Sequence, residues 1–350
     1  WAKELSTYIK GSGIEIPIIL GGIHASMFPE DAISHPDIDV VCINEGELPM
    51  LEFMQALEKG ENYSTIDNLW VRKSGEVVKN CARPKMTAEE LNDLPFADRA
   101  LYKKYDHFVK YPFEIFVGSR GCPFKCTFCE IPEINDMYGG KSVYYVDPIR
   151  FVDEIQEVKD KGLLDGKTVL FTDSTFNSHK KWFLRFLDEY KQRIAVPFSC
   201  NLRLDLVNEE QVKALKESGC DNVRLGVEAG DYDIRKRILG KTLKDEQIYK
   251  ATHLLHKYKI SFMTYNLLAS PEETYEQAWE TIRINRRIKP TACLMQVFVL
   301  FPGLQATNYA LEKGLIQKED LDLIENHPYN IDLSLLTKHP EKNPDAMKIC

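Results

Sequence analysis

Residues 119–129, SRGCPFKCTFC, contain three of the nine cysteines of the chain. Cys122, Cys126 and Cys129 follow directly on an apolar segment of strand length, EIFVGS at 114–119. The other cysteines stand singly along the chain, which is not the pattern of a small disulfide-stabilised secreted protein. The stretch therefore predicts one metal-binding loop at the end of a strand, in a protein of a reducing compartment.

The three thiols are typical of a cubane iron–sulfur cluster, whose irons take cysteine thiolates. A structural zinc site usually takes four ligands in two pairs, and the nearest histidine, His107, lies upstream of the strand. A usual cluster has four cysteines, so three leave one iron open to a cofactor or substrate. Buried structural thiols, or zinc with a distant fourth ligand, are the alternatives.

The segments that follow the cysteines alternate between strand and helix patterns. Such alternation predicts an α/β fold with a parallel sheet, and six units fit a partial, open (β/α)6 barrel of the TIM type. In such barrels the chemistry lies at the carboxyl ends of the strands, which is where the cysteines are expected. The expected strands are 114–119, 167–173, 196–203, 222–228, 260–269 and 293–300.

The rest of the chain suggests further parts on either side of this barrel. Two short strand–helix patterns before residue 60 indicate half of an α/β domain, and NLWVRKSGEVVKN reads as a hairpin. The chain opens on Trp1 rather than Met and ends in a polar tail, so we expect a fragment cut at both ends. The predicted domains are 1–60, a partial α/β domain; 61–113, a hairpin and connector; 114–315, the barrel; and 316–350, an incomplete C-terminal extension.

Composition limits the partners. Lys and Arg number 45 against 53 Asp and Glu, a net charge of −8, so no nucleic-acid partner is expected. No apolar run is long enough to span a membrane, and no secretory signal segment is visible. Together with the cysteine usage, these features predict a cytoplasmic protein.

The spacing CxxxCxxC after the first strand of a β/α repeat resembles the radical S-adenosylmethionine (SAM) superfamily, over residues 112–315. The resemblance implies a [4Fe-4S] cluster whose open iron chelates the amino and carboxylate groups of SAM. One electron, from a donor such as flavodoxin or ferredoxin, then cleaves SAM, and the resulting 5′-deoxyadenosyl radical removes a substrate hydrogen atom. Phe128 matches the aromatic position that packs near the adenine.

Other strand ends supply further SAM contacts under the same resemblance. Asp173 and Ser174 stand near the expected place of the methionyl amine, although the family's glycines are missing there. Arg203 would pair with the SAM carboxylate and Glu228 would accept the ribose hydroxyls, with Arg203 or water pairing Glu228 when SAM is absent. For Asp173 and Ser174 the alternative is a cluster that caps a helix and forms a turn. For Arg203 it is an ion pair on the surface. Lys241, in LGKTL, resembles a recurrent lysine of the family, but the favoured expectation is a lysine on an exposed turn.

The segment 267–274, LLASPEET, follows the fifth strand, where relatives often read GLPGET. Ala269 and Glu272 replace two glycines, which argues against a close approach of this backbone to the adenine. The segment instead predicts a helix cap.

Within residues 1–60, GGIHAS and NEGELP resemble the second half of a cobalamin-binding, flavodoxin-like domain, as found ahead of many radical SAM modules. In such domains the glycine pair, here Gly21 and Gly22, lets the nucleotide tail of the cofactor lie against the backbone. His24 would touch a cofactor edge, the alternative being an ordinary polar surface residue.

Three functions follow from these patterns. The first is a radical SAM enzyme that carries out cobalamin-assisted methyl transfer or ring rearrangement on an unidentified small-molecule or lipid-like substrate. The second is a radical SAM enzyme that does not use cobalamin. The third is a non-enzymatic iron–sulfur electron-transfer protein, which would be expected to show a fourth cysteine near the other three, and none is present near them.

Overall fold

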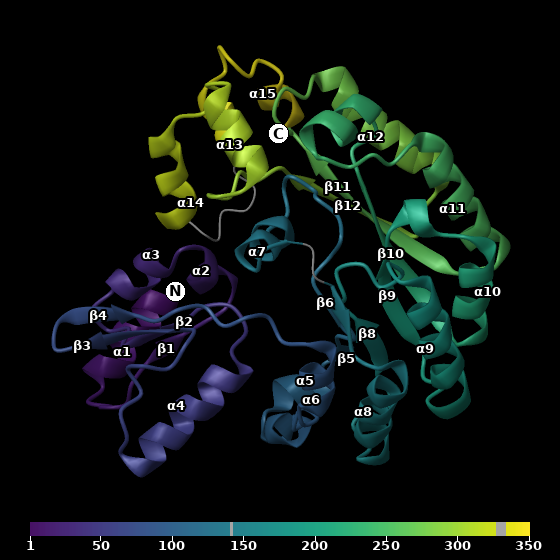
Figure 1. Ribbon diagram of the computed structural model, residues 1–350. Coiled ribbons are helices and arrows are strands. Elements are labelled where there is room, and N and C mark those ends of the chain that lie inside the picture. Colours follow the sequence, from purple (N-terminus) through teal and green to yellow (C-terminus); the bar gives the residue numbers. More distant parts are fainter. Residues whose placement is uncertain (141–142, 327–333) are drawn as a thin grey trace. The chain divides into compact units, whose positions relative to one another are not determined.

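The structure is a computed structural model that describes residues 1–140, 143–326 and 334–350 (Figure 1). It divides into two compact units. Unit 1 consists of Trp1–Thr87 and Glu133–Gly140, and unit 2 of Ala88–Pro132 and Lys141–Cys350. Part of the expected C-terminal extension, 327–333, lies outside the described residues.

Unit 2 is built on a six-stranded sheet in which every neighbouring pair of strands is parallel. The strand order is β12-β11-β10-β9-β8-β5, so the strands lie side by side in chain order. Right-handed β/α connections with short loops produce this order, and the predicted open barrel of six strands is confirmed. The strands are β5 (Phe113–Phe116), β8 (Thr168–Phe171), β9 (Phe198–Leu202), β10 (Cys220–Glu228), β11 (Ser261–Leu268) and β12 (Ala292–Val297).

Helices follow the strands and cover the outer face of this sheet (Figure 1). N-cap residues mark where two of these helices begin. The side chain of Asp147 accepts a hydrogen bond from the backbone N–H of Ile149, and that of Asn208 accepts one from Gln211. Thr274 begins a capping box at the end of the LLASPEET segment, as expected. The helices are α8 (Pro148–Asp160), α9 (Lys180–Arg193), α10 (Glu209–Glu217), α11 (Asp245–Lys257) and α12 (Tyr275–Ile288).

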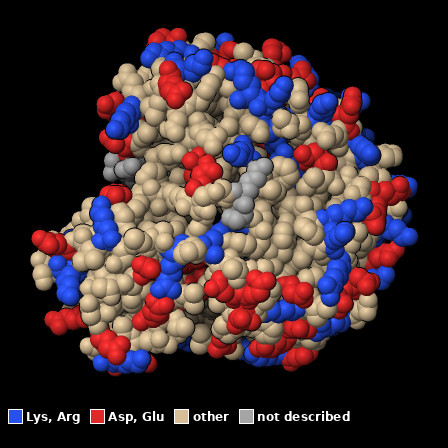
Figure 2. All heavy atoms as spheres, viewed as in Figure 1, with Lys and Arg blue, Asp and Glu red and all other residues tan. Residues whose placement is uncertain are grey.

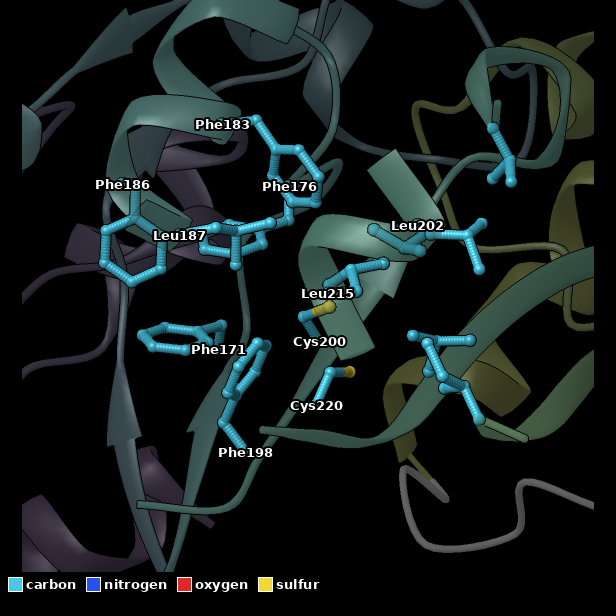
Figure 3. Packing of buried hydrophobic residues seen from close by; sticks show 14 of the residues in the cluster. Phe171, Phe176, Phe183, Phe186, Leu187, Phe198, Cys200, Leu202, Leu215 and Cys220 are labelled. Atoms are coloured by element: carbon cyan, nitrogen blue, oxygen red, sulfur yellow. The ribbon is translucent and has the colours of Figure 1, made fainter. Parts of the chain in front are cut away.

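The main core lies between the sheet and these helices. Alternate residues of a strand point to one face, so Phe198, Cys200 and Leu202 of β9 all enter it, as Phe171 of β8 does. Figure 3 shows the rings of helix α9, Phe186 among them, packing onto these strand side chains. Burying one such side chain contributes roughly 1.5–3 kcal/mol, and the core thereby fixes the strand ends that carry the site.

Unit 1 contains a four-stranded sheet of order β1-β2-β3-β4. The first two strands are parallel and the others antiparallel. The predicted hairpin is present, and Ser74 and Gly75 of its turn both have positive φ, of 51° and 86°. It was expected in the connector, but it extends the N-terminal sheet because β3 pairs with β2. The elements are β1 (Ile19–Leu20), β2 (Val40–Cys42), β3 (Leu69–Lys73), β4 (Glu76–Lys79), α1 (Ala2–Gly11), α2 (Ile23–Met27), α3 (Pro29–Ser34) and α4 (Glu47–Lys59).

The remaining elements are short. Helix α7 (Ile131–Met137) begins in unit 2 and continues into unit 1. The others, all in unit 2, are α5 (Ala88–Asp93), η1 (Arg99–Lys104), α6 (Asp106–Lys110), β6 (Ser119–Arg120), β7 (Tyr144–Tyr145), η2 (Leu204–Leu206), the π-helix η3 (Ile234–Ile238), α13 (Gln305–Glu312), η4 (Lys318–Leu321), α14 (Asp322–Asn326), η5 (Leu335–Lys338) and α15 (Ala346–Ile349).

The surface is mixed in charge. Figure 2 shows Lys and Arg side chains interspersed with Asp and Glu side chains over the face in view, without a broad field of one sign. Among the described helices, none combines the length and the apolar character that crossing a bilayer requires.

Candidate functional site

The three cysteines of the CxxxCxxC motif share one irregular loop between β6 and α7, beyond the carboxyl end of β5. Cys122, Cys126 and Cys129 are half-buried and form no disulfide, and none of them is among the buried hydrophobic clusters. Within the described residues, no three His, Cys, Asp or Glu side chains are gathered as a set that could hold a metal ion as they stand. Three thiols of the right type therefore lie on one loop, and a shared cluster requires the side chains to turn toward one another.

The start of the loop is held by a buried carboxylate. Asp173, at the end of β8, accepts the backbone N–H of Gly118 at 3.1 and 3.2 Å and the hydroxyl of Ser119. Asp173 is 1% exposed, and burial raises its pKa to about 6. Its neighbour Ser174, also predicted as a SAM contact, is exposed. In the structure Asp173 is thus committed to the loop itself.

Thr175 touches the first cysteine. Its Oγ1 lies 3.3 Å from Sγ of Cys122 and also donates to the carbonyl of Ser174. Thr175 is buried, and sequence reasoning passed over it because a threonine in a polar turn carries no distinctive signal. The end of β8 therefore contacts the cysteine loop at two points.

Arg203, at the end of β9, reaches the second cysteine. Its Nη1 lies 3.8 Å from Sγ of Cys126, and its guanidinium carbon lies 3.5 Å from the centre of the Phe124 ring. Its Nε donates to Asp205 at 2.8 Å. Burial raises the pKa of Cys126 and Glu228 adds to that effect, whereas the Lys241 and Arg203 cations oppose it. The structure thus brings predicted site residues from three segments to one place.

Glu228, at the end of β10, is paired with Lys241. The two side chains meet at 3.0 Å from Oε1 to Nζ, and the residues are only 9% and 5% exposed. The expectation of an exposed Lys241 is wrong, because the turn after η3 points this side chain inward to the Glu228 carboxylate and the carbonyl of Gly226. The expected pairing of Glu228 with Arg203 is also wrong, since Arg203 is taken up by Asp205.

The third thiol has a different environment. Burial and the neighbouring Glu130 carboxylate raise the pKa of Cys129 to about 12. The residue before it, Phe128, packs edge-on against Phe298 with ring centroids 6.4 Å apart, in an apolar cluster of unit 2. The aromatic position of the motif is therefore part of a packed surface beside the loop.

The LLASPEET segment forms a tight turn at the end of β11. Ala269 and Glu272 have φ angles of 57° and 60°, the left-handed region that the expected glycines would favour. Glu273 accepts the backbone N–H of Ser270 at 2.9 Å, and burial raises its pKa to about 7. The sequence departs from the GLPGET pattern while the backbone adopts a glycine-like turn.

The residues predicted for cobalamin lie in unit 1. Gly21 and Gly22 separate β1 from α2, and Gly22 has a φ of 95°. His24, in the first turn of α2, pairs with Asp31 at 3.0 Å, and its side chain is 57% exposed. The three residues are thus gathered after a strand, at a place where a ligand could meet backbone.

Unit 2 also has a cavity of about 510 Å³ elsewhere. It is lined by aromatic side chains, including Tyr102, Phe108, Tyr111 and Phe113. Phe113 is the first residue of β5, whereas the cysteines follow its last residue. The cavity is therefore distinct from the cysteine site.

Comparison with known proteins gives the family context. Residues 116–284 match the family model described as Radical SAM superfamily. An uncharacterized methyltransferase of Pyrococcus horikoshii is 27% identical over 90% of this chain and 67% of its own length. Bacteriochlorophyllide d C-8(2)-methyltransferase of Chlorobaculum tepidum is 25% identical over 87% of this chain and 64% of its own. Anaerobic magnesium-protoporphyrin IX monomethyl ester cyclase of Rubrivivax gelatinosus is 26% identical over 82% and 52%. The chain thus spans about half to two thirds of the length of these relatives.

Among solved structures, the radical S-adenosylmethionine methyltransferase TsrM of Kitasatospora setae, with cobalamin and a [4Fe-4S] cluster bound, superposes with a TM-score of 0.75. The two chains are 18% identical, and the match covers 89% of this chain and 60% of that one. At that identity the likeness is one of fold.

Proposed function

Residues 116–284 of this chain are a radical SAM domain, and from that premise we propose a radical SAM enzyme that carries out cobalamin-assisted methyl transfer. Cys122, Cys126 and Cys129 hold a [4Fe-4S] cluster, and the cluster leaves one iron for SAM. Bound there, the cluster and SAM supply one-electron cleavage of the sulfonium bond and so start radical chemistry.

One observation carries this proposal: three cysteines share one loop, and the strand ends reach them there, with Thr175 beside the sulfur of Cys122 and Arg203 beside that of Cys126. A cation near a thiolate favours the charged, metal-binding form. The donor set fits a cluster in chemistry, since three cysteines stand on one loop and no disulfide uses them. To bind a cluster, the three side chains would turn toward one another. Thr175 adds a hydroxyl next to Cys122.

The other residues act on SAM. Glu228 accepts hydrogen bonds from the ribose hydroxyls, and the contact with Lys241 orients its carboxylate. Arg203 faces the SAM carboxylate, and Phe128 provides an apolar surface for the adenine. Asp173 and Ser174 stand near the methionyl amine; of these, Ser174 has the exposed hydroxyl that can contact it directly.

Methyl transfer is favoured over the other radical reactions because two of the similar proteins are named methyltransferases. Cobalamin would bind along Gly21, Gly22 and His24. The substrate is a small molecule or a lipid-like compound. Similar proteins that are named as a cyclase support ring modification as the alternative reaction.

None of the nine cysteines, all of which lie within the described residues, forms a disulfide, and this supports a cytoplasmic location, where thiols stay reduced. A flavodoxin or ferredoxin would supply the electron. Nucleic acid is not a partner on this proposal, in line with the net charge of −8.

Anaerobic reconstitution with ferrous iron and sulfide tests the proposal. We expect a broad visible absorption and about four irons per chain. With a reductant supplied, we expect mass spectrometry to show 5′-deoxyadenosine from reductive cleavage of SAM, and S-adenosylhomocysteine where the methyl group is transferred to an acceptor. Iron uptake without any SAM conversion would instead favour the electron-transfer protein. Identical products and rates with and without added cobalamin would favour the cobalamin-independent enzyme.

A further inference from the structure

The cysteine loop is docked on the segment that follows the π-helix η3. Thr127, the residue after Cys126, bonds with two of its polar groups to Ile238 and Leu239 and with the third to helix α13. Its N–H donates to the carbonyl of Leu239 at 3.2 Å, and its hydroxyl donates to the carbonyl of Ile238. Its carbonyl accepts the N–H of Ala306 at 3.0 Å. The middle of the CxxC half of the motif is therefore fixed by backbone partners.

Gly240 allows this close approach. Its φ is +64°, and a Cβ at this position would lie 2.7 Å from the carbonyl oxygen of Lys125 and 3.1 Å from Cγ2 of Thr127. Real Cβ atoms do not come within 3.0 Å of such atoms, and the nearest obstacle is backbone rather than a flexible side chain. Any side chain at position 240 must push the cysteine loop away.

The next residue, Lys241, reaches in the other direction. Its Nζ donates to the carbonyl of Gly226 and pairs with Glu228. Gly226 makes room for this pair, since a Cβ there would lie 2.1 Å from Oε1 of Glu228 and 2.8 Å from Nζ of Lys241. Two consecutive residues thus contact the cysteine loop and the proposed ribose-binding carboxylate.

The segment is itself held in place by Arg235, which is fully buried in η3. Its guanidinium donates to the carbonyls of Ala229, Gly230 and Leu243, and it pairs with Asp245. These partners come before and after the turn, so the turn cannot shift without breaking them. π-Helical turns occur often at functional sites, and this one carries a clamped backbone.

We propose that Ile238–Lys241 is a positioning element that sets the cysteine loop at a fixed place relative to Glu228. Gly240 is the positioning residue on the loop side and Lys241 on the carboxylate side. This inference rests on the proposed function, because it assigns the element to the alignment of the cluster with SAM. Neither residue takes part in the chemistry.

Gly240→Ala tests it, with Gly314→Ala as the matched control. Gly314 has the same φ of +64°, but its Cβ would meet only the Nζ of Lys342, at 3.8 Å. Both variants carry the same backbone strain, and only the first displaces the loop. In the full chain, reconstituted anaerobically, we expect Gly240→Ala to alter the EPR signal of the reduced cluster and its response to SAM, and to weaken SAM binding about tenfold or more. Gly314→Ala should match the unsubstituted protein in both respects.

A readout without the cluster is the alkylation of the apo chain by iodoacetamide, followed by mass spectrometry. Cys126 and Cys129 should react faster in Gly240→Ala than in Gly314→Ala, because the loop is released. Should Gly240→Ala fail to fold, Thr127→Val removes one donated bond at nearly constant volume, and Thr307→Val removes a comparable bond to Phe301 as its control. The same differences are expected in this pair.

Equal EPR signals, SAM affinities and alkylation rates in variant and control would overturn the inference while leaving the proposed function standing. Failure of the unsubstituted chain to take up iron and sulfide would remove both. The two failures are therefore distinguished by the unsubstituted protein alone.

Discussion

The Nζ atom of Lys241 lies 3.0 Å from Oε1 of Glu228, thirteen positions earlier in the chain, and both side chains are almost fully buried. Glu228 has a φ of 68°, so the strand ends in a left-handed residue that turns its carboxylate toward the lysine. Removing one partner of such a buried pair lowers the stability of the folded chain, because the other charge is then left buried without compensation.

Glu228→Gln should lower SAM affinity about tenfold or more. The amide loses the charge-assisted hydrogen bonds that the carboxylate accepts from the SAM ribose, and such a bond contributes roughly 1.5–3 kcal/mol. The visible spectrum of the reconstituted cluster should not change. Equilibrium dialysis with labelled SAM measures the effect, and Glu280→Gln at an exposed helical position serves as the control. Unaltered SAM binding in Glu228→Gln would remove Glu228 from the site.

Replacement of Cys126 by alanine should abolish the visible absorption and most of the bound iron after reconstitution, since a cubane with two protein thiolates is poorly held. Cys81→Ala, at an exposed cysteine away from the loop, should retain both. Iron and sulfide analysis decides the matter. Full iron content in Cys126→Ala would show that the loop is not the ligand.

Asp173→Asn should destabilise the chain by about 1–3 kcal/mol. The amide replaces one of the two acceptor oxygens by an NH2 group, which cannot accept the N–H of Gly118, and it removes the charge that assists the bond from Ser119. The anchor of the cysteine loop is then weakened, so we also expect less iron per chain after reconstitution. Denaturant unfolding and iron analysis are the measurements. Asp188→Asn, at an exposed position of α9, should change neither.

Glu273 predicts a pH dependence. Burial raises its pKa from 4.5 to about 7, so the folded chain binds this proton more tightly than the unfolded chain does. The contribution of Glu273 to the free energy of unfolding is therefore greatest below about pH 4.5. It falls as the pH rises toward 7, and about 3 kcal/mol is lost in all. Glu273→Gln should flatten that slope in denaturant unfolding between pH 5 and 8. An unchanged slope would show that the carboxyl is not held protonated.

Phe186→Ala tests the packing between α9 and the sheet. This side chain is fully buried and stacks on Trp182 with ring centroids 5.5 Å apart. Its loss should lower the free energy of unfolding by about 3–5 kcal/mol. Phe301→Ala, at a ring that is 47% exposed, should cost no more than about 1 kcal/mol. Similar losses in the two variants would contradict the assignment of the core.

The order of the sheet could be predicted because each strand carries its own local pattern. In β9, Phe198, Cys200 and Leu202 alternate with polar residues. Short right-handed connections between consecutive β/α units then place each strand next to the one that follows it in the chain. The position of Arg203 and Glu228 beside the cysteines followed from their place at strand ends.

The contacts that organise the site left no such pattern. Thr127 is held by carbonyls of Ile238 and Leu239, and every residue carries a carbonyl. The burial of Lys241 depends on the carboxylate of Glu228, which only the folded turn brings near. The sequence shows just a single lysine after a glycine, and this pattern predicts an exposed side chain. Ala269 and Glu272 adopt left-handed angles without being glycine, which residue type alone does not reveal.

Helix α7 limits how the two units of this protein can be exchanged by recombination. Glu133–Gly140 belong to unit 1, although they follow the cysteine loop of unit 2 in the chain. The hydroxyl of Tyr138 accepts the backbone N–H of Glu45, and Lys85 lies over its ring at 5.1 Å. A chimera that exchanges residues 1–87 alone would leave this helical stretch against a foreign surface. The two units are therefore not interchangeable modules with one junction, and a recombinant that keeps both intact must transplant the stretch after the third cysteine together with the N-terminal sheet.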